Sequence, residues 1–211
     1  MHEKRPNTLF NMVFILATVS IISAGALAAT DVLTKKDRDD RDQKNKIEAI
    51  LKVFPENKNL QAGASLRYLC DKSEHFKRLE TNDKVDERER SRILEIFPVI
   101  ENKILIGYAL KTFTEKGYSG KISIMVGINS NGLINETVVI DHKETPGLGT
   151  GMSKTSFKNQ FIGKSPVNGF KLKVKKDGGD VDAITAATIS SRAFCDSIDR
   201  AFKVYSILSN H

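Results

Sequence analysis

The sequence predicts an α+β protein: a twisted, mainly antiparallel sheet flanked by helices, with one N-terminal transmembrane helix. Three observations lead to this class. An apolar run near the start is long enough to cross a bilayer. β-Forming segments follow one another between 104 and 140, two of them joined by an Asn-Gly turn. A helical pattern of apolar residues then ends the chain. We expect a membrane anchor over 1–30, a charged helical stalk and N-terminal helices over 31–92, and a ligand-binding domain over 93–211.

The anchor is predicted by the absence of charge from Pro6 to Thr30. A helix of about 20 apolar residues spans the hydrocarbon layer. The alternative is a cleaved signal peptide, because Ala24-Gly25-Ala26 resembles a cleavage site. We favour the anchor, since the apolar run is longer than the core of a usual signal peptide. The basic residues that follow it do not fix the orientation, because long domains cross membranes largely regardless of such charges.

Between the anchor and the sheet the chain is strongly charged. Residues 31–46 mix acids and bases, which is typical of a solvated helix, and helical spacing from Ile47 to Phe54 ends at Pro55. We expect helix and loop over 64–92. Strands are expected from Ile93 onward, with runs over 104–111, 121–128 and 133–140 and a turn at 129–132. A further alternating segment covers 170–174.

Composition and residue spacing exclude several classes of function. The net charge is +7, but the chain has no Trp and no basic helix with base-reading residues, so we expect no nucleic-acid partner. No metal-ligand spacing, catalytic triad or carboxylate pair can be found, and we assign no metal site and no catalytic residue, His142 included. We expect Cys70 and Cys195 to be buried free thiols; the alternative is a disulfide between them in an oxidising compartment.

The segment from Asp182 to Ser191 joins a glycine-rich turn to the last helix. A hydroxyl before a helix caps free N–H groups, so Thr188 or Ser190 is the expected N-cap. The first turn of a helix also attracts anions, and a phosphate there could reach the Thr188 hydroxyl. Capping alone is the simpler interpretation of this pattern.

A second constellation follows the hairpin, at His142–Thr150. Pro146 and Gly147 predict a tight loop whose backbone can approach a flat ligand closely. Leu148 could pack on a ring face, while Glu144 and Thr145 offer polar contacts at a ring edge. Taken alone, the segment is more typical of an ordinary turn.

Together these two segments resemble the FMN-binding G-subunit family of Rnf electron-transport complexes. Asp-x-x-Thr-x-Ala-Thr over 182–188 is similar to the family's flavinylation motif, and Glu-Thr-Pro-Gly-Leu-Gly over 144–149 to its second hallmark. The chain departs from the first motif once, with Ala186 where the family has Gly. If the backbone there needs a positive φ, Ala adds strain of about 1 kcal/mol. The resemblance covers residues 95–205 well and 31–92 loosely.

The resemblance implies FMN bound covalently by a phosphoester to Thr188. The other expected cofactor contacts are Thr185, Ala187, Asp182, Glu144, Thr145, Gly147 and Leu148. It implies an electron-transfer subunit of an ion-translocating ferredoxin:NAD oxidoreductase, anchored by a single pass in the cell inner membrane with its domain on the periplasmic or extracytoplasmic side. Its expected partners are the membrane, other membrane subunits of the complex and a flavin transferase for maturation. Two alternatives remain: the C subunit of a sodium-translocating NADH:quinone reductase, and a membrane-anchored module that binds an anionic ligand without redox work.

Overall fold

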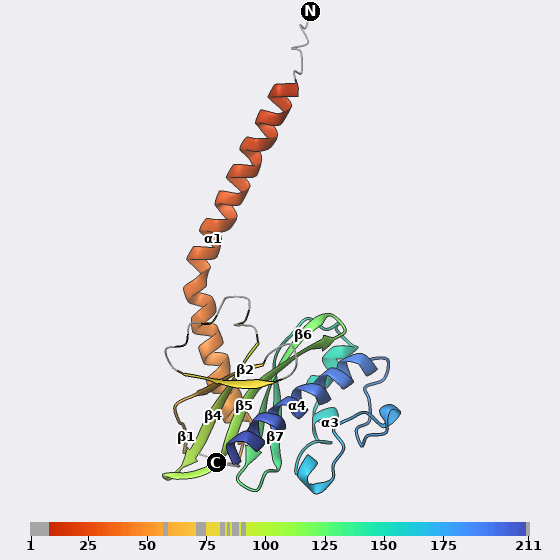
Figure 1. The fold of residues 1–211 in the computed structure, drawn as a ribbon. Coiled ribbons are helices and arrows are strands. Elements are labelled where there is room, and N and C mark those ends of the chain that lie inside the picture. The colour runs from red at the N-terminus through yellow and green to blue at the C-terminus, as the bar shows by residue number, and fades with distance from the viewer. Residues whose placement is uncertain are drawn as a thin grey trace, which may run out of the picture. The chain divides into compact units, whose positions relative to one another are not determined.

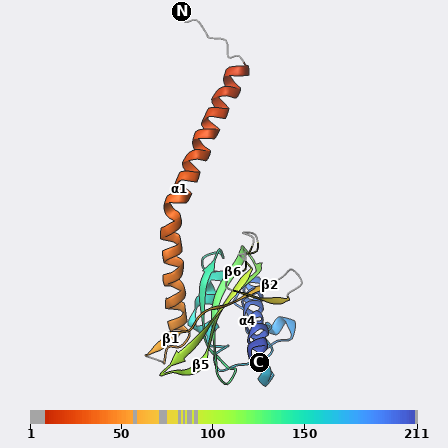
Figure 2. The same cartoon turned by 60° about the vertical axis from the view of Figure 1, so that its left-hand side comes forward.

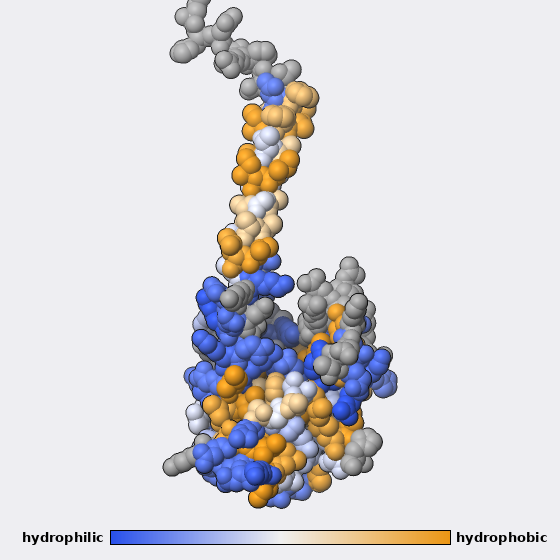
Figure 3. Space-filling view, turned by 90° about the vertical axis from the view of Figure 1, so that its left-hand side faces the viewer, coloured by the Kyte–Doolittle hydropathy of each residue, from blue (hydrophilic) through white to orange (hydrophobic). Residues whose placement is uncertain are grey.

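A computed structural model describes residues 9–56, 59–70, 75–80, 83, 85, 89 and 92–209. This part of the chain divides after Asn45 into two compact units. The first unit holds most of α1 (Leu9–Lys52), a continuous helix. Its segment Leu9–Lys35 is long and apolar enough to cross a membrane, and Figure 3 shows apolar side chains along its surface. The predicted anchor therefore corresponds to an exposed apolar helix.

The second unit is built on an antiparallel sheet in the order β3-β2-β4-β5-β6-β7, with β1 also paired to β4. The strands are β1 (Leu60–Ala62), β2 (Leu66–Cys70), β3 (Phe76–Leu79), β4 (Ile93–Glu101), β5 (Ile104–Gly117), β6 (Gly120–Asn129) and β7 (Ile134–His142). Figure 1 shows the long β5 and β6 at the centre of the sheet. The predicted fold class is confirmed, as is the hairpin that turns at 129–132.

Helical segments cover both faces of this sheet. α4 (Thr188–Ser209) crosses one face, as Figures 1 and 2 show, and the end of α1 packs on the other. Side chains alternate along a strand, so Leu110 of β5 faces α4 while its neighbour Ala109 faces Val53, just beyond α1. The remaining helical segments lie between β7 and α4; they are η1 (Gly149–Ser153), α3 (Thr155–Lys158), η2 (Pro166–Asn168) and η3 (Lys175–Asp177).

The α4 face carries the larger core. The predicted apolar stripe of the last helix is buried there, including Phe194, Ile198 and Phe202. Phe157 and Phe161 meet Phe194 with ring centroids 5.3 and 5.2 Å away. Aromatic pairs at such distances add packing energy beyond their buried area. α4, whose first residue is Thr188, is thus held firmly against the sheet.

Two secondary-structure predictions were wrong. The helix and loop expected over 64–92 are in part the strands β2 and β3, whose short length and outward charges hide their alternation. The strand expected over 170–174 is irregular and forms only one bridge, Val174 with Val181. There the Lys173 N–H bonds to the carbonyl of Lys171, two residues back, which bends the chain. Cys70 and Cys195 are both buried free thiols, not a disulfide.

Candidate functional site

A cavity of about 570 Å³ brings the two predicted segments together at the N-terminal end of α4. Its volume is in the range of small-molecule and cofactor sites. The lining residues come from the β5–β6 turn, the loop after β7 and the start of α4; they are Tyr118, Glu144, Thr145, Leu148, Gly149, Ala186, Ala187, Thr188, Ile189 and Ser190. Residues more than 40 positions apart in the sequence therefore share one site.

The Glu144 side chain joins the parts of this site. It is only 5% exposed, and its carboxylate accepts a hydrogen bond from the Ser119 N–H at 2.9 Å. The same carboxylate accepts a second hydrogen bond from the Ser190 hydroxyl. Because a buried carboxylate is costly without such donors, these bonds hold the β5–β6 turn, the loop after β7 and α4 together.

Two glycines make room for this carboxylate. A Cβ atom on Gly149 would lie 2.4 Å from Glu144 Oε2 and 2.7 Å from Ser190 Oγ. A Cβ atom on Gly117 would lie 2.8 Å from Glu144 Oε1 and 2.3 Å from the Gly120 carbonyl oxygen. The close approach of the three segments thus requires glycine at both positions.

The start of α4 has free hydrogen-bond donors. Thr188 is the first helical residue, and Ala187 is the N-cap, since its carbonyl accepts the N–H of Ser191 at 3.1 Å. The prediction that Thr188 or Ser190 caps the helix was therefore wrong. Among the described residues, the N–H groups of Thr188, Ile189 and Ser190 have no acceptor. Three such donors at a helix start, with the positive end of the dipole, favour an anion.

The turn before α4 is held by Ser191. Its buried hydroxyl donates to the Ala187 carbonyl at 3.0 Å and accepts the Ile184 N–H at 2.9 Å. Between these anchors Ala186 has φ +59°, in the left-handed region that favours glycine. The condition under which Ala186 adds strain is therefore met in this structure.

The predicted contacts divide between two neighbouring cavities. Thr188, Ala187, Glu144, Thr145 and Leu148 line the first. Gly147, Asp182 and Thr185 line a second cavity of about 340 Å³, to which Leu148 also contributes. Asp182 pairs with Lys175 at 2.8 Å, and its N–H donates to the Gln160 side chain at 2.7 Å. Through these contacts Asp182 holds the turn in place. It lies outside the cavity that Thr188 lines.

Five lining residues were not among the predicted contacts: Gly149, Ala186 and Ser190, which lie in or beside the two motifs, and the apolar Tyr118 and Ile189. Tyr118 is 70% exposed at the tip of the β5–β6 turn, and Ile189 is 45% exposed on the first turn of α4. The turn sequence at 117–120 offered no ligand-binding pattern, and Ile189 was read only as part of the helix face. His142 accepts the Glu144 N–H at 3.2 Å and so supports the loop.

The residues that line the cavity fit the chemistry of FMN. Leu148, Tyr118 and Ile189 offer apolar surface for a flat ring system, and Leu148 is 43% exposed. The free N–H groups of α4 suit the phosphate at the other end of the molecule. A largely apolar wall with a few convergent polar groups is the usual construction of a cofactor site.

The chain is similar to known proteins in sequence and in structure. The FMN-binding domain family matches residues 117–203. The G subunit of the Na⁺-translocating ferredoxin:NAD⁺ oxidoreductase complex of Acetobacterium woodii is 27% identical over 204 residues, which are 95% of this chain and 93% of that one. The G subunit of the ion-translocating oxidoreductase complex of Vibrio parahaemolyticus is 30% identical over 187 residues, 87% of this chain and 82% of that one. The crystal structure of the C subunit of Na⁺-translocating NADH-quinone reductase from Parabacteroides distasonis is 20% identical with a TM-score of 0.48, and covers 67% of this chain and 77% of that one.

Proposed function

Since the chain belongs to the G-subunit family of ion-translocating oxidoreductase complexes, we propose that it is an electron-transfer subunit with FMN attached to Thr188. FMN supplies the redox chemistry when bound. The chain's own residues bind the cofactor, orient it and set the charge around it. Thr188 is a point of attachment and takes no part in electron transfer.

One observation carries this proposal: Thr188 lines the cavity and is also the first residue of α4. A phosphate on its hydroxyl oxygen would sit beside the three free N–H groups of the first helical turn. A ring attached to that phosphate would have Leu148, Tyr118 and Ile189 within the same cavity. No other hydroxyl of the motif combines these features, because Thr185 lines the second cavity and Ser190 and Ser191 are buried and already bonded.

We infer that a separate flavin transferase attaches the cofactor, with FAD as donor. The Thr188 oxygen would form a bond to the phosphorus of the FMN half as the pyrophosphate bond of FAD breaks. AMP would leave, and the hydroxyl proton would pass to solvent or to a base of the transferase. This reaction changes no oxidation state, so it needs no reductant.

The same proposal covers location and partners. The apolar segment Leu9–Lys35 would anchor the chain in the inner membrane, with the domain on the extracytoplasmic side. The other subunits of an ion-translocating complex would supply and remove the electrons. N-terminal sequencing of the mature protein tests the anchor, because a chain that starts near Ala29 would show a cleaved signal peptide instead.

The attachment site is tested by co-expressing the full chain with a flavin transferase. Thr188→Val nearly preserves the side-chain shape but deletes the hydroxyl, so the variant should reach the membrane without any flavin that survives denaturation. Thr185→Val is the matched control and should keep its covalent flavin. Peptide mass spectrometry should place the adduct on Thr188. An adduct on another residue, or flavin retained in Thr188→Val, would refute the assignment; a wild type without flavin would favour a binding module without redox work.

A further inference from the structure

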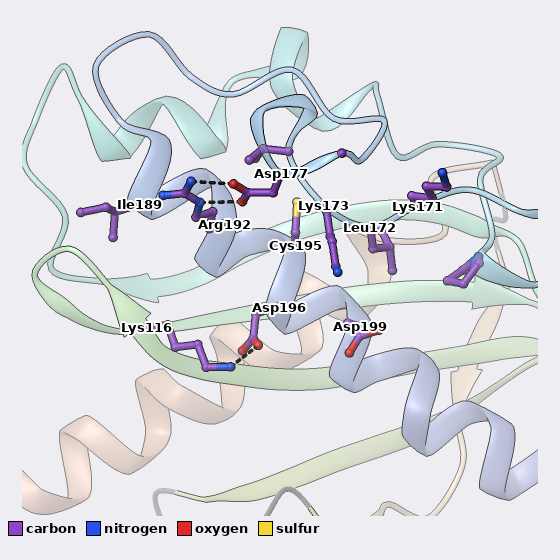
Figure 4. A pocket seen from close by; sticks show the side chains of 13 residues that line it. Lys116, Lys171, Leu172, Lys173, Asp177, Ile189, Arg192, Cys195, Asp196 and Asp199 are labelled. Atoms are coloured by element: carbon purple, nitrogen blue, oxygen red, sulfur yellow. Dashed lines mark hydrogen bonds and ion pairs between the residues drawn. The ribbon is translucent and has the colours of Figure 1, made fainter.

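A third cavity, larger than the two described above, lies beside the flavin site along α4. It measures about 680 Å³ and lies between α4 and the loop over 166–178. Figure 4 shows its lining, with Cys195 near the middle and charged side chains on both sides. Leu172 and Ile189 add apolar surface to it. The proposed function assigns no role to this cavity.

The charges of this cavity are unequally neutralised. Arg192 pairs with Asp177 at 2.6 Å, Lys116 with Asp196 at 2.7 Å, and Asp199 with Lys203 at 3.0 Å. In the part of the chain that the structure describes, no carboxylate lies within ion-pair distance of Lys171 or Lys173. Each acid of the lining is thus paired with a base, while Lys171 and Lys173 form no ion pair among the described residues. Asp177, the carboxylate that interacts electrostatically with Lys173, is already paired with Arg192. An occupant with carboxylates would supply the missing charge.

The surrounding loop adds further positive charge beside the cavity. Residues 164–178 contain five lysines and one acid, Asp177, which is paired with Arg192. Lys171 and Lys173 are both exposed, and Figure 4 shows Lys173 extending toward α4 while Lys171 points away from it. Clustered charge of one sign raises the rate at which an oppositely charged partner arrives, and salt weakens this effect. The loop therefore favours an acidic partner over a neutral one.

The position of the cavity suggests what that partner does. Ile189 lines both this cavity and the flavin site, so the two cavities are neighbours. A protein segment seated here would lie next to a flavin held by Thr188. Electron exchange needs such closeness, and apolar side chains of the segment could cover Leu172 and Ile189.

We propose that this cavity is the docking groove for an acidic, partly apolar segment of the subunit that exchanges electrons with the flavin. Lys173 inside the groove and Lys171 at its rim bind the carboxylates of this segment, and Leu172 and Ile189 receive its apolar side chains. The proposal rests on the proposed function, because it presumes a flavin in the neighbouring site. It adds the partner's chemistry and the surface that recognises it.

The direct test is zero-length cross-linking of the assembled complex in native membranes. A carbodiimide joins a lysine amine to a carboxylate only where the two are in contact. We expect peptide mass spectrometry to find Lys171 or Lys173 joined to Asp or Glu of another subunit. Exposed lysines far from the cavity, Lys77 and Lys103, serve as controls and should not give these links. Absence of any link from Lys171 and Lys173 overturns the proposal.

A kinetic test uses the double variant Lys171→Gln/Lys173→Gln and the control Lys77→Gln/Lys103→Gln, which changes the net charge equally. Flavin reduction in the complex should slow about 3- to 10-fold in the first variant at low salt and lose its salt dependence. The control should behave like wild type. Equal rates in all three proteins, or lysine-dependent binding to anionic lipid vesicles without cross-links, would overturn the docking groove.

Covalent flavin is measured first in every protein, so the two proposals fail separately. A wild type without flavin refutes the proposed function. Full flavin in all variants together with unchanged rates refutes only the docking groove.

Discussion

The Ser190 hydroxyl donates a hydrogen bond to the Glu144 carboxylate, across 46 positions of the sequence. Glu144 belongs to the loop after β7, and Ser190 to the first turn of α4. Both side chains are buried. This contact joins two of the three segments that line the candidate site, so the shape of the cavity depends on it.

Replacing Ser190 by Ala should destabilise the protein by about 1–3 kcal/mol, because one oxygen of a buried carboxylate loses its donor. Covalent attachment should persist, since Thr188 is unchanged, but the flavin should become more accessible to a soluble quencher. Ser206→Ala, on an exposed part of the same helix, is the control. Chemical denaturation measures both variants. Equal stability of Ser190→Ala and wild type would mean that the contact does not hold the site together.

Replacing Ala186 by Gly should stabilise the protein by about 1 kcal/mol, because Ala186 has φ +59°, which an L-residue adopts at a cost and glycine adopts freely. Since the same turn presents Thr188, flavin attachment should also become more complete. Ala193→Gly on the interior of α4 should have the opposite effect on stability, since it opens a cavity and weakens the helix. A loss of stability in Ala186→Gly, measured by chemical denaturation, would contradict the strain argument.

Tyr118 should contact the flavin ring and quench its fluorescence. The chain has four Tyr and no Trp, and Tyr118 is the only Tyr among the described residues that line the cavity. An aromatic ring stacked on flavin quenches it by electron transfer, which an aliphatic side chain cannot do. Tyr118→Leu should therefore lengthen the fluorescence lifetime of the bound flavin while keeping apolar contact. Tyr205→Leu, at the far end of α4, is the control, and identical lifetimes in both variants would remove Tyr118 from the ring contact.

Asp196 should make stability depend on pH in the acid range. Burial acts to raise its pKa, but hydrogen bonds from Lys116, Thr114 and Arg200 outweigh burial, so its pKa lies below the ordinary value of 3.8. A lowered folded-state pKa stabilises the protein above the unfolded-state pKa, and this stabilisation is lost as pH falls through the folded-state value.

The variant Asp196→Asn should lose about 1–3 kcal/mol at pH 7, and its difference from wild type should shrink as the pH drops below about 4. Urea unfolding across this range measures the effect. Asp199→Asn, which breaks only the exposed pair with Lys203, should cost less than about 0.5 kcal/mol. A difference that stays constant with pH would mean that Asp196 does not titrate as its contacts require.

Local patterns in the sequence determined much of the secondary structure of this protein and several of its candidate cofactor contacts. Alternation and turn residues predicted β5, β6 and β7, and helical spacing predicted α4, because these signals arise within a few residues of one another. Two motifs identified Thr188, Glu144 and Leu148 as candidate contacts and named FMN as their ligand. Covalent attachment and the role of each side chain remain predictions.

Only the tertiary structure decided which of these residues share a cavity. It separated Asp182 and Thr185 from Thr188, although they are close in sequence, because the turn held by Ser191 directs them into a different cavity. It added Tyr118 and Ile189, which no local pattern indicated. The strands β2 and β3 likewise became visible only once paired, since short strands with charged outer side chains gain their stability from the strands beside them. Such choices depend on long-range contacts, which a local pattern does not contain.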